Sequence, residues 1–200
     1  MNGVEPAIGA ADFGLSAGDR VWWDYRDWTA AMRIPANVGS FPEPFLHGYE
    51  GDLHPVTLEC LGEGGCGTIE KVLRKIGVDY NHEPRPDAIR ILAGPWSLVR
   101  RDPAAAMIEG GPRTSGVFAR FERRRGSWRL LVLDEAGELS LDAGAGAALV
   151  AATRRSDQPP VWVVTGTDRA GAAAAQRLFQ APTLAGRYAV GPGGQPVPSQ

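Results

Sequence analysis

The sequence has few lysines, only two cysteines and no long apolar run. Lysine occurs only at Lys71 and Lys75, and the net charge of the 200 residues is -2. This balance argues against a surface built for nucleic acid or for an anionic membrane. The basic run at residues 123–125 is typical of a solvated hairpin tip. Because no apolar stretch approaches the roughly 20 residues that cross a bilayer, we expect no transmembrane segment and no nucleic-acid partner.

The two cysteines, Cys60 and Cys66, are separated by a glycine-rich loop. Glycine lets such a short loop fold back until the two Cα atoms reach disulfide distance. A disulfide loop, two free thiols and half of a metal site are all open. The disulfide is favoured, because the spacing is not that of a zinc motif and no histidine is close by.

The signals for location disagree. A disulfide indicates an oxidising compartment. Residues 1–5, however, lack the basic and apolar parts of a signal peptide. The cysteines therefore favour an extracellular or cell-envelope protein, whereas the N-terminus, if it is authentic, indicates a cytoplasmic one.

Aromatic residues are concentrated near the N-terminus. Half of the six tryptophans lie within residues 22–28. After a Gly-Asp turn, residues 20–25 are expected to form a strand with a tryptophan on each face. The cluster either packs a joint in the core or lines a groove for a flat or sugar-like ligand or a partner protein. The candidate ligand contacts here are Trp22, Trp23, Tyr25, Arg26 and Trp28.

Patterns of strand, turn and helix follow from residue 54 onward. They occur around residues 56–76, 89–109 and 161–179. Residues 116–133 predict an antiparallel hairpin, and the Ala/Gly-rich stretch 145–155 predicts a helix. The fold class is therefore α/β, with α+β as an alternative: an N-terminal β-hairpin plus a small α/β domain with a mixed sheet.

Proline and glycine divide the chain into four expected parts. They are residues 1–28, an ordered proline-rich connection at 29–54, the α/β domain at 55–190 and a flexible tail at 191–200.

One turn in the α/β part is a candidate ligand site. Thr165, Gly166, Thr167 and Asp168 lie between a strand and a helix, where α/β folds bind ligands, and N–H groups at a helix start can receive an anion or a sugar hydroxyl. The alternative is structural: Thr167 or Asp168 caps the helix and Gly166 permits the turn. Nucleotide-binding glycine motifs and nucleophile motifs are absent. We expect no catalytic residue and no bound metal.

Residues 2–6 read Asn-Gly-Val-Glu-Pro, and residues 15–25 contain a Gly-Asp turn followed by an aromatic strand. These segments resemble the closing strands of the transcobalamin-like C-terminal domain, a β-grasp family of uncharacterised function. Residues 27–45 and the cysteine pair are similar to bacterial secreted or lipoprotein-like members. The resemblance implies that residues 1–28 are a truncated β-grasp remnant and that the chain has an envelope or extracellular binding role. Cobalamin is implied as a cofactor by this resemblance alone.

Two functions follow from these observations. The first is a non-enzymatic binding or interaction protein of the cell envelope or extracellular space, whose partner is a small molecule, a glycan or a protein. The second is an extracellular enzyme acting on a carbohydrate or cell-wall polymer, with its site near Asp168 and the aromatic segment.

Overall fold

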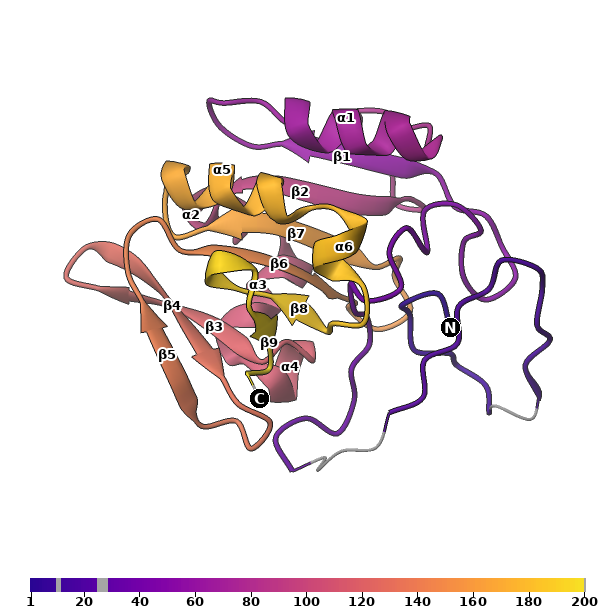
Figure 1. Ribbon diagram of the computed structural model, residues 1–200, viewed down its shortest axis with the longest axis horizontal. Coiled ribbons are helices and arrows are strands. Elements are labelled where there is room, and N and C mark those ends of the chain that lie inside the picture. The colour runs from indigo at the N-terminus through magenta and orange to yellow at the C-terminus, as the bar shows by residue number, and fades with distance from the viewer. Residues whose placement is uncertain (10–11, 25–28, 200) are drawn as a thin grey trace.

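The computed structural model describes residues 1–9, 12–24 and 29–199. Its main sheet is mixed and has six strands in the order β1-β2-β7-β6-β8-β9, and a second, antiparallel sheet has the order β3-β4-β5 (Figure 1). The strands of the main sheet, in that order, are Val56–Cys60, Ile89–Pro95, Val161–Gly166, Ala148–Thr153, Ala189–Val190 and Pro196–Val197. Those of the second sheet are Ala119–Arg124, Ser127–Leu133 and Leu139–Ala143. This arrangement confirms the expected α/β class with a mixed sheet.

Short helices connect the strands. The α-helices α1 to α6 span Gly67–Ile76, Trp96–Val99, Pro103–Ala106, Pro112–Ser115, Arg169–Leu178 and Ala181–Leu184. Two 3-10 turns, η2 and η3, span Met107–Gly110 and Pro192–Gly194.

The main sheet separates two apolar layers. Along β7, Trp162 and Val164 face the layer that holds α1 and α5, whereas Val161 and Val163 face the layer that holds α2, α3 and the second sheet. Successive strand residues point to opposite faces, so β7 supplies both layers in turn. All of its residues are buried, which explains why it is apolar without alternation.

Local signals place the longer helices correctly. Gly77 ends α1 in the left-handed conformation at φ 77°, as a glycine at this position does best. Asp168 caps α5, and Asp102 caps α3 with both Ala104 N–H and Ala105 N–H donating to it. The N-cap of α1 is Cys66, which makes no side-chain cap bond.

The expected helix at residues 145–155 is wrong, because this stretch forms the strand β6. It pairs antiparallel with β7 from Ala148 opposite Gly166 to Thr153 opposite Val161. Small alanines fit a strand that is buried on both faces. The ladder bonds to β7 and this burial outweigh the intrinsic helix preference of alanine.

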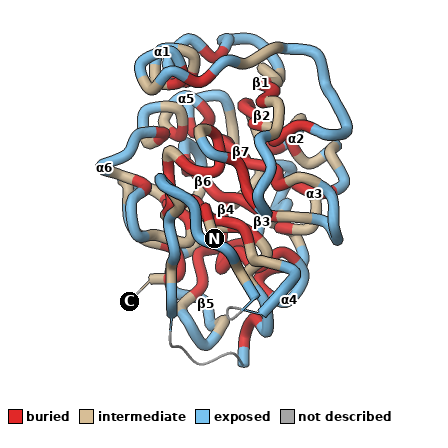
Figure 2. The backbone as a smooth tube through the Cα atoms, turned by 90° about the vertical axis from the view of Figure 1, so that its right-hand side faces the viewer, coloured by how far each residue is buried: buried red, intermediate tan, exposed pale blue. Residues whose placement is uncertain are grey.

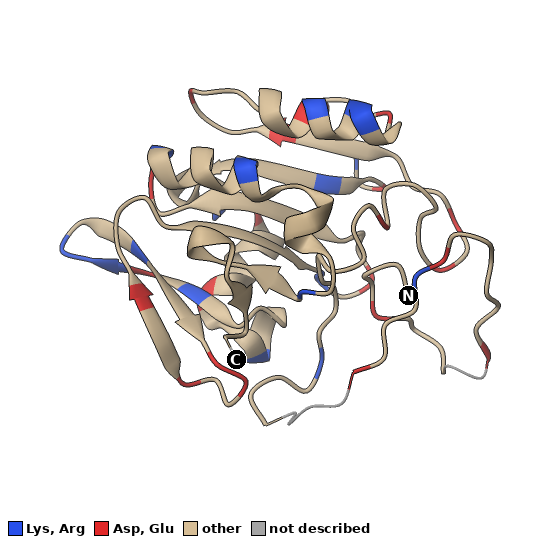
Figure 3. Ribbon diagram, in the orientation of Figure 1, with Lys and Arg blue, Asp and Glu red and all other residues tan. Residues whose placement is uncertain are grey.

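The C-terminal segment also differs from the expected flexible tail. Over residues 191–199, β9 pairs with β8, and Val197 is buried. The hairpin at 116–133 is confirmed as β3 and β4, and its basic tip is the blue end at the left of Figure 3. Figure 3 also shows the basic residues of α1 on the outside of the molecule.

The N-terminal segment is the stretch of residues 1–55; its described residues are irregular and mostly lie along the outside of the molecule (Figure 2). The strand expected at 20–25 is absent from the described residues 20–24, and residues 1–9 pair only through an isolated bridge between Val4 and Ala36. Val21 is 45 % exposed and Trp23 is 76 % exposed. Arg20 bonds Asn2 through its N–H and its carbonyl, but residues 20–24 pair with no strand of the described chain, so the expected N-terminal hairpin is not formed there.

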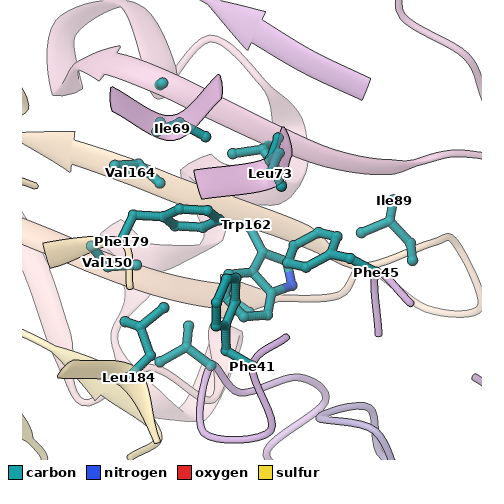
Figure 4. Packing of buried hydrophobic residues seen from close by; sticks show 14 of the residues in the cluster. Phe41, Phe45, Ile69, Leu73, Ile89, Val150, Trp162, Val164, Phe179 and Leu184 are labelled. Carbon is teal, nitrogen blue, oxygen red and sulfur yellow. The ribbon is translucent and has the colours of Figure 1, made fainter. Parts of the chain in front are cut away.

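The part of this segment at 29–54 is ordered, and its aromatic residues enter the core. The ring centroid of Phe45 lies 4.8 Å from that of Trp162, and the centroid of Phe41 lies 5.2 Å from that of Phe179. Figure 4 shows these four rings close together. The connection is therefore part of the apolar layer above the sheet.

Cys60 and Cys66 are joined in a disulfide, with Cα atoms 5.7 Å apart. The bond ties the end of β1 to the start of α1. It confirms the favoured interpretation of the pair. Among the described residues, no helix combines the length and apolarity needed to cross a membrane.

Candidate functional site

The predicted turn at residues 165–168 is held by hydrogen bonds within the protein. Thr165 Oγ1 donates to the Gly94 carbonyl at 2.8 Å. Thr167 Oγ1 donates to the Gly144 carbonyl at 2.9 Å and accepts from Ala147 N–H at 3.1 Å. Both threonines are buried, so their hydroxyls tie β7 to its neighbours.

The other two residues of the turn fix the start of α5. One carboxylate oxygen of Asp168 accepts from Gly171 N–H, and the other accepts from Gly146 N–H, both at 2.8 Å. A Cβ at Gly166 would lie 2.2 Å from the Gly171 carbonyl carbon. In this turn Asp168 caps α5 and Gly166 permits close packing against it. This agrees with the structural interpretation of the turn that we gave as the alternative to a ligand site.

The predicted aromatic contacts separate into two environments. Trp22 stacks on Tyr188 with ring centroids 4.6 Å apart, and the Tyr188 hydroxyl donates to the Asp24 carboxylate. Trp23 is largely exposed, as expected if part of the cluster lacks a partner surface. The remaining predicted contacts lie outside the described residues: Tyr25, Arg26 and Trp28.

A small cavity of about 350 Å³ lies beside Trp22 and Tyr188. It shares the lining residues Glu5 and Met32 with a larger cavity of about 660 Å³, here called the joint cavity. The joint cavity lies between the N-terminal segment and the α/β part of the chain. Its lining includes charged side chains and methionines, among them Glu5, Met32, Arg33, Met107, Arg113 and Arg154.

The guanidinium groups of the joint cavity differ in their partners. Arg33 forms an ion pair with Glu5 at 3.0 Å. Arg154 is paired with Glu50 at 3.0 Å and lies 5.2 Å from the centroid of the Tyr49 ring. Arg113, the second residue of α4, is exposed and has no ion pair or hydrogen bond within the described residues. Arg113 is therefore the cation that remains available to a ligand.

Apolar surface borders these charges. Met32 is 87 % exposed and belongs to both cavities, and Met107 also lines the joint cavity. Methionine adapts its shape to different apolar partners. The volume lies in the range of small-molecule sites, and the lining carries the charged side chains Glu5, Arg33, Arg113, Arg154 and Asp157. The arrangement suits an anionic group on an apolar body.

Sequence reasoning missed this cavity, because its residues come from four separate stretches of the chain. Residues 5–7, 29–35, 107–116 and 154–157 meet only in the folded protein. None of these stretches carries a local motif. The only signal was the ordered proline-rich connection, which implied a surface against which it packs.

No protein-family model, curated protein or solved structure matches the chain. The candidate site therefore rests on the geometry of these residues. In the described part of the chain, no three His, Cys, Asp or Glu side chains are grouped so as to hold a metal ion.

Proposed function

We propose that this protein is a non-enzymatic binding protein of the cell envelope or extracellular space, and that the joint cavity takes a small anionic ligand with an apolar body. The observation that carries the proposal is Arg113, a cation without a protein partner among the described residues, at a cavity bordered by Met32 and Met107. The location is supported by the Cys60–Cys66 disulfide.

The surface of the N-terminal segment supports an interaction role. Most of the exposed large apolar side chains of the described residues belong to this segment, and two others lie on β5. Those of the segment are Ile8, Leu15, Val21, Trp23, Met32 and Leu53. Exposed apolar side chains mark a binding surface where they form a contiguous patch, and of these residues Ile8 and Leu53 line the same cavity. The resemblance of residues 2–25 to a β-grasp domain of secreted proteins agrees with this role.

The enzymatic alternative near Asp168 has less support. Both oxygens of that carboxylate accept hydrogen bonds from backbone N–H groups, so each already has a partner that stabilises the fold. If Asp168→Ala loosens the start of α5 and leaves ligand binding unchanged, the role of this residue is structural.

Hexanoate is a suitable probe for the joint cavity, because it combines one carboxylate with a short hydrocarbon chain. Titration followed by NMR should give saturable shifts at residues 29–35 and 107–116. Arg113→Gln should weaken hexanoate binding roughly tenfold, about 1.4 kcal/mol, through loss of a charge-assisted hydrogen bond. Uncharged hexan-1-ol should bind both proteins equally.

Arg101→Gln is the matched control, since Arg101 is also exposed and lies outside the joint cavity. It should bind hexanoate like the unchanged protein. Equal affinities of the Arg113→Gln and Arg101→Gln proteins would refute the assignment of the ligand carboxylate to Arg113.

A further inference from the structure

A second cavity, of about 590 Å³, is formed almost wholly by the N-terminal segment. Its apolar walls include Ile8, Phe13, Leu46 and Leu53, and its ionisable side chains include Asp19 and His47. No lysine or arginine is among the described residues that line it. Its charge is thus opposite to that of the joint cavity, and we call it the acidic cavity.

A buried carboxylate orients the imidazole of His47. Glu43 is only 2 % exposed, and one of its oxygens lies 2.7 Å from His47 Nδ1 while the other accepts His47 N–H at 2.9 Å. The ring also packs against Gly18, where a Cβ would lie 2.7 Å from His47 Cε1. Contacts on two sides therefore hold the ring in one orientation.

This contact determines which nitrogen is available to a ligand. In a neutral imidazole that donates Nδ1–H to a carboxylate, the lone pair is on Nε2. His47 Nε2 has no protein partner within the described residues, and the side chain is 48 % exposed. Nε2 is therefore the nitrogen of His47 left for a ligand at the acidic cavity, and it is an acceptor when the ring is neutral.

Asp19 is a second acceptor, and it is equally well held. Its carboxylate accepts from Ser16 N–H at 2.7 Å and from Asn2 Nδ2 at 2.9 Å. Asn2 is buried and also donates to the Gly48 carbonyl at 2.9 Å. The Ser16 N–H bond and the Asn2 amide hold the pKa of Asp19 below its usual range, against the opposing effect of burial. The carboxylate is thus ionised at neutral pH and has further lone pairs for a ligand.

We infer that the acidic cavity binds an organic ammonium ion, with the ammonium group on Asp19 and His47 Nε2 and its hydrocarbon part against Ile8, Phe13, Leu46 and Leu53. An ammonium group can donate to the remaining lone pairs of Asp19 and to Nε2 of a neutral His47. The described lining holds no lysine or arginine, and the Met1 ammonium acts on Asp19 from outside that lining. The inference concerns a site distinct from the joint cavity, with a ligand of opposite charge.

Hexylammonium tests this site on the full chain with its disulfide intact. It should give saturable NMR shifts at residues 13–19 and 46–53 and bind more tightly than hexan-1-ol. Asp19→Asn keeps a hydrogen-bond acceptor but removes the charge, and it should weaken hexylammonium binding roughly tenfold. His47→Phe keeps a ring over Gly18 and should weaken it by about threefold to tenfold.

A charge added to the wall gives a test that leaves the Asp19 hydrogen bonds in place. Leu53 is 73 % exposed at the acidic cavity, and Leu139 is 53 % exposed on β5. Leu53→Arg should repel hexylammonium, whereas Leu139→Arg adds the same charge elsewhere and should not. The inference fails if folded Asp19→Asn and Leu53→Arg proteins bind hexylammonium as tightly as the unchanged protein does, or if the unchanged protein shows no saturable binding.

The two sites are separated by crossing probes and variants. Arg113→Gln should weaken hexanoate binding and leave hexylammonium binding unchanged, and Asp19→Asn should do the reverse. If the unchanged protein binds hexanoate but not hexylammonium, the inference on the acidic cavity is overturned. If it binds hexylammonium but not hexanoate, the proposed function is overturned.

Discussion

His54 has a buried polar atom that the fold does not satisfy. Its ring stacks on Tyr49 with centroids 4.1 Å apart, and its Nε2 is buried without a hydrogen-bond partner among the described residues. A buried polar group without a partner costs about 1–3 kcal/mol. We expect His54→Phe, which keeps the stack, to raise the free energy of unfolding by about 1 kcal/mol in urea denaturation.

His82 is the matched control for that substitution. Its Nδ1 lies 2.8 Å from the Leu58 carbonyl, and its ring contacts Tyr80 edge-on, with centroids 5.6 Å apart. His82→Phe removes a satisfied hydrogen bond and should lower stability by about 1 kcal/mol. If both phenylalanine variants shift stability in the same direction, the gain at His54 is not due to its unsatisfied nitrogen.

At the level of single residues, short-range signals were sufficient where the partner is close in sequence. The Cys60–Cys66 bond and the caps at Asp102 and Gly77 all depend on neighbours within a few positions. His47 had no such signal, although its carboxylate partner is only four positions away at Glu43. Its role depends on burial of Glu43 by distant parts of the chain, and a loop histidine alone does not reveal that.

Glu109 joins α2 to η2. It accepts from Arg100 Nε at 2.6 Å and from the indole N–H of the buried Trp96 at 3.1 Å. The Arg100 hydrogen bond lowers the pKa of Glu109, against the opposing effect of burial. This pair connects two short elements that have few bonds of their own.

The lowered pKa of Glu109 predicts how stability depends on pH. Because the folded pKa lies below that of the unfolded chain, the stabilisation is complete above the unfolded value of about 4.3 and is lost as pH falls through the folded pKa. We expect Glu109→Gln to be less stable by about 1 kcal/mol at neutral pH, since both groups are partly exposed. Urea denaturation as a function of pH should show this difference shrinking below the unfolded pKa; a constant difference would contradict it.

At the level of elements, periodicity predicted α1 and α5 well but failed for β6. The apolar positions of α1 recur at helical spacing, and α5 begins at a true cap. The sequence of β6, Ala-Leu-Val-Ala-Ala-Thr, has no alternation because both of its faces are buried. A fully buried strand and a buried helix look alike by pattern, and only pairing with β7 decides between them.

At the scale of the whole molecule, the N-terminal segment touches both apolar layers. Ala30 and Ala31 belong to the layer beside the second sheet, while Phe41 and Phe45 belong to the layer beside α1 and α5. The joint cavity and the acidic cavity are both bounded by this segment. Long-range placement of this kind leaves no local pattern in the sequence, which is why the cavities could not be predicted from it.

The packing of Phe45 against Trp162 predicts that the N-terminal segment and the sheet unfold together. Phe45 is 6 % exposed, and truncation of a buried phenylalanine to alanine costs about 3–5 kcal/mol. Phe45→Ala should therefore lower the single unfolding transition of the whole chain, seen equally by tryptophan fluorescence and by hydrogen exchange in α5. Trp23→Ala removes a larger ring from the same segment, but one that is 76 % exposed, and it should change stability by no more than about 0.5 kcal/mol. If Phe45→Ala gave an early transition of the segment and left the exchange of α5 unchanged, residues 29–54 would be an independent unit rather than part of the core.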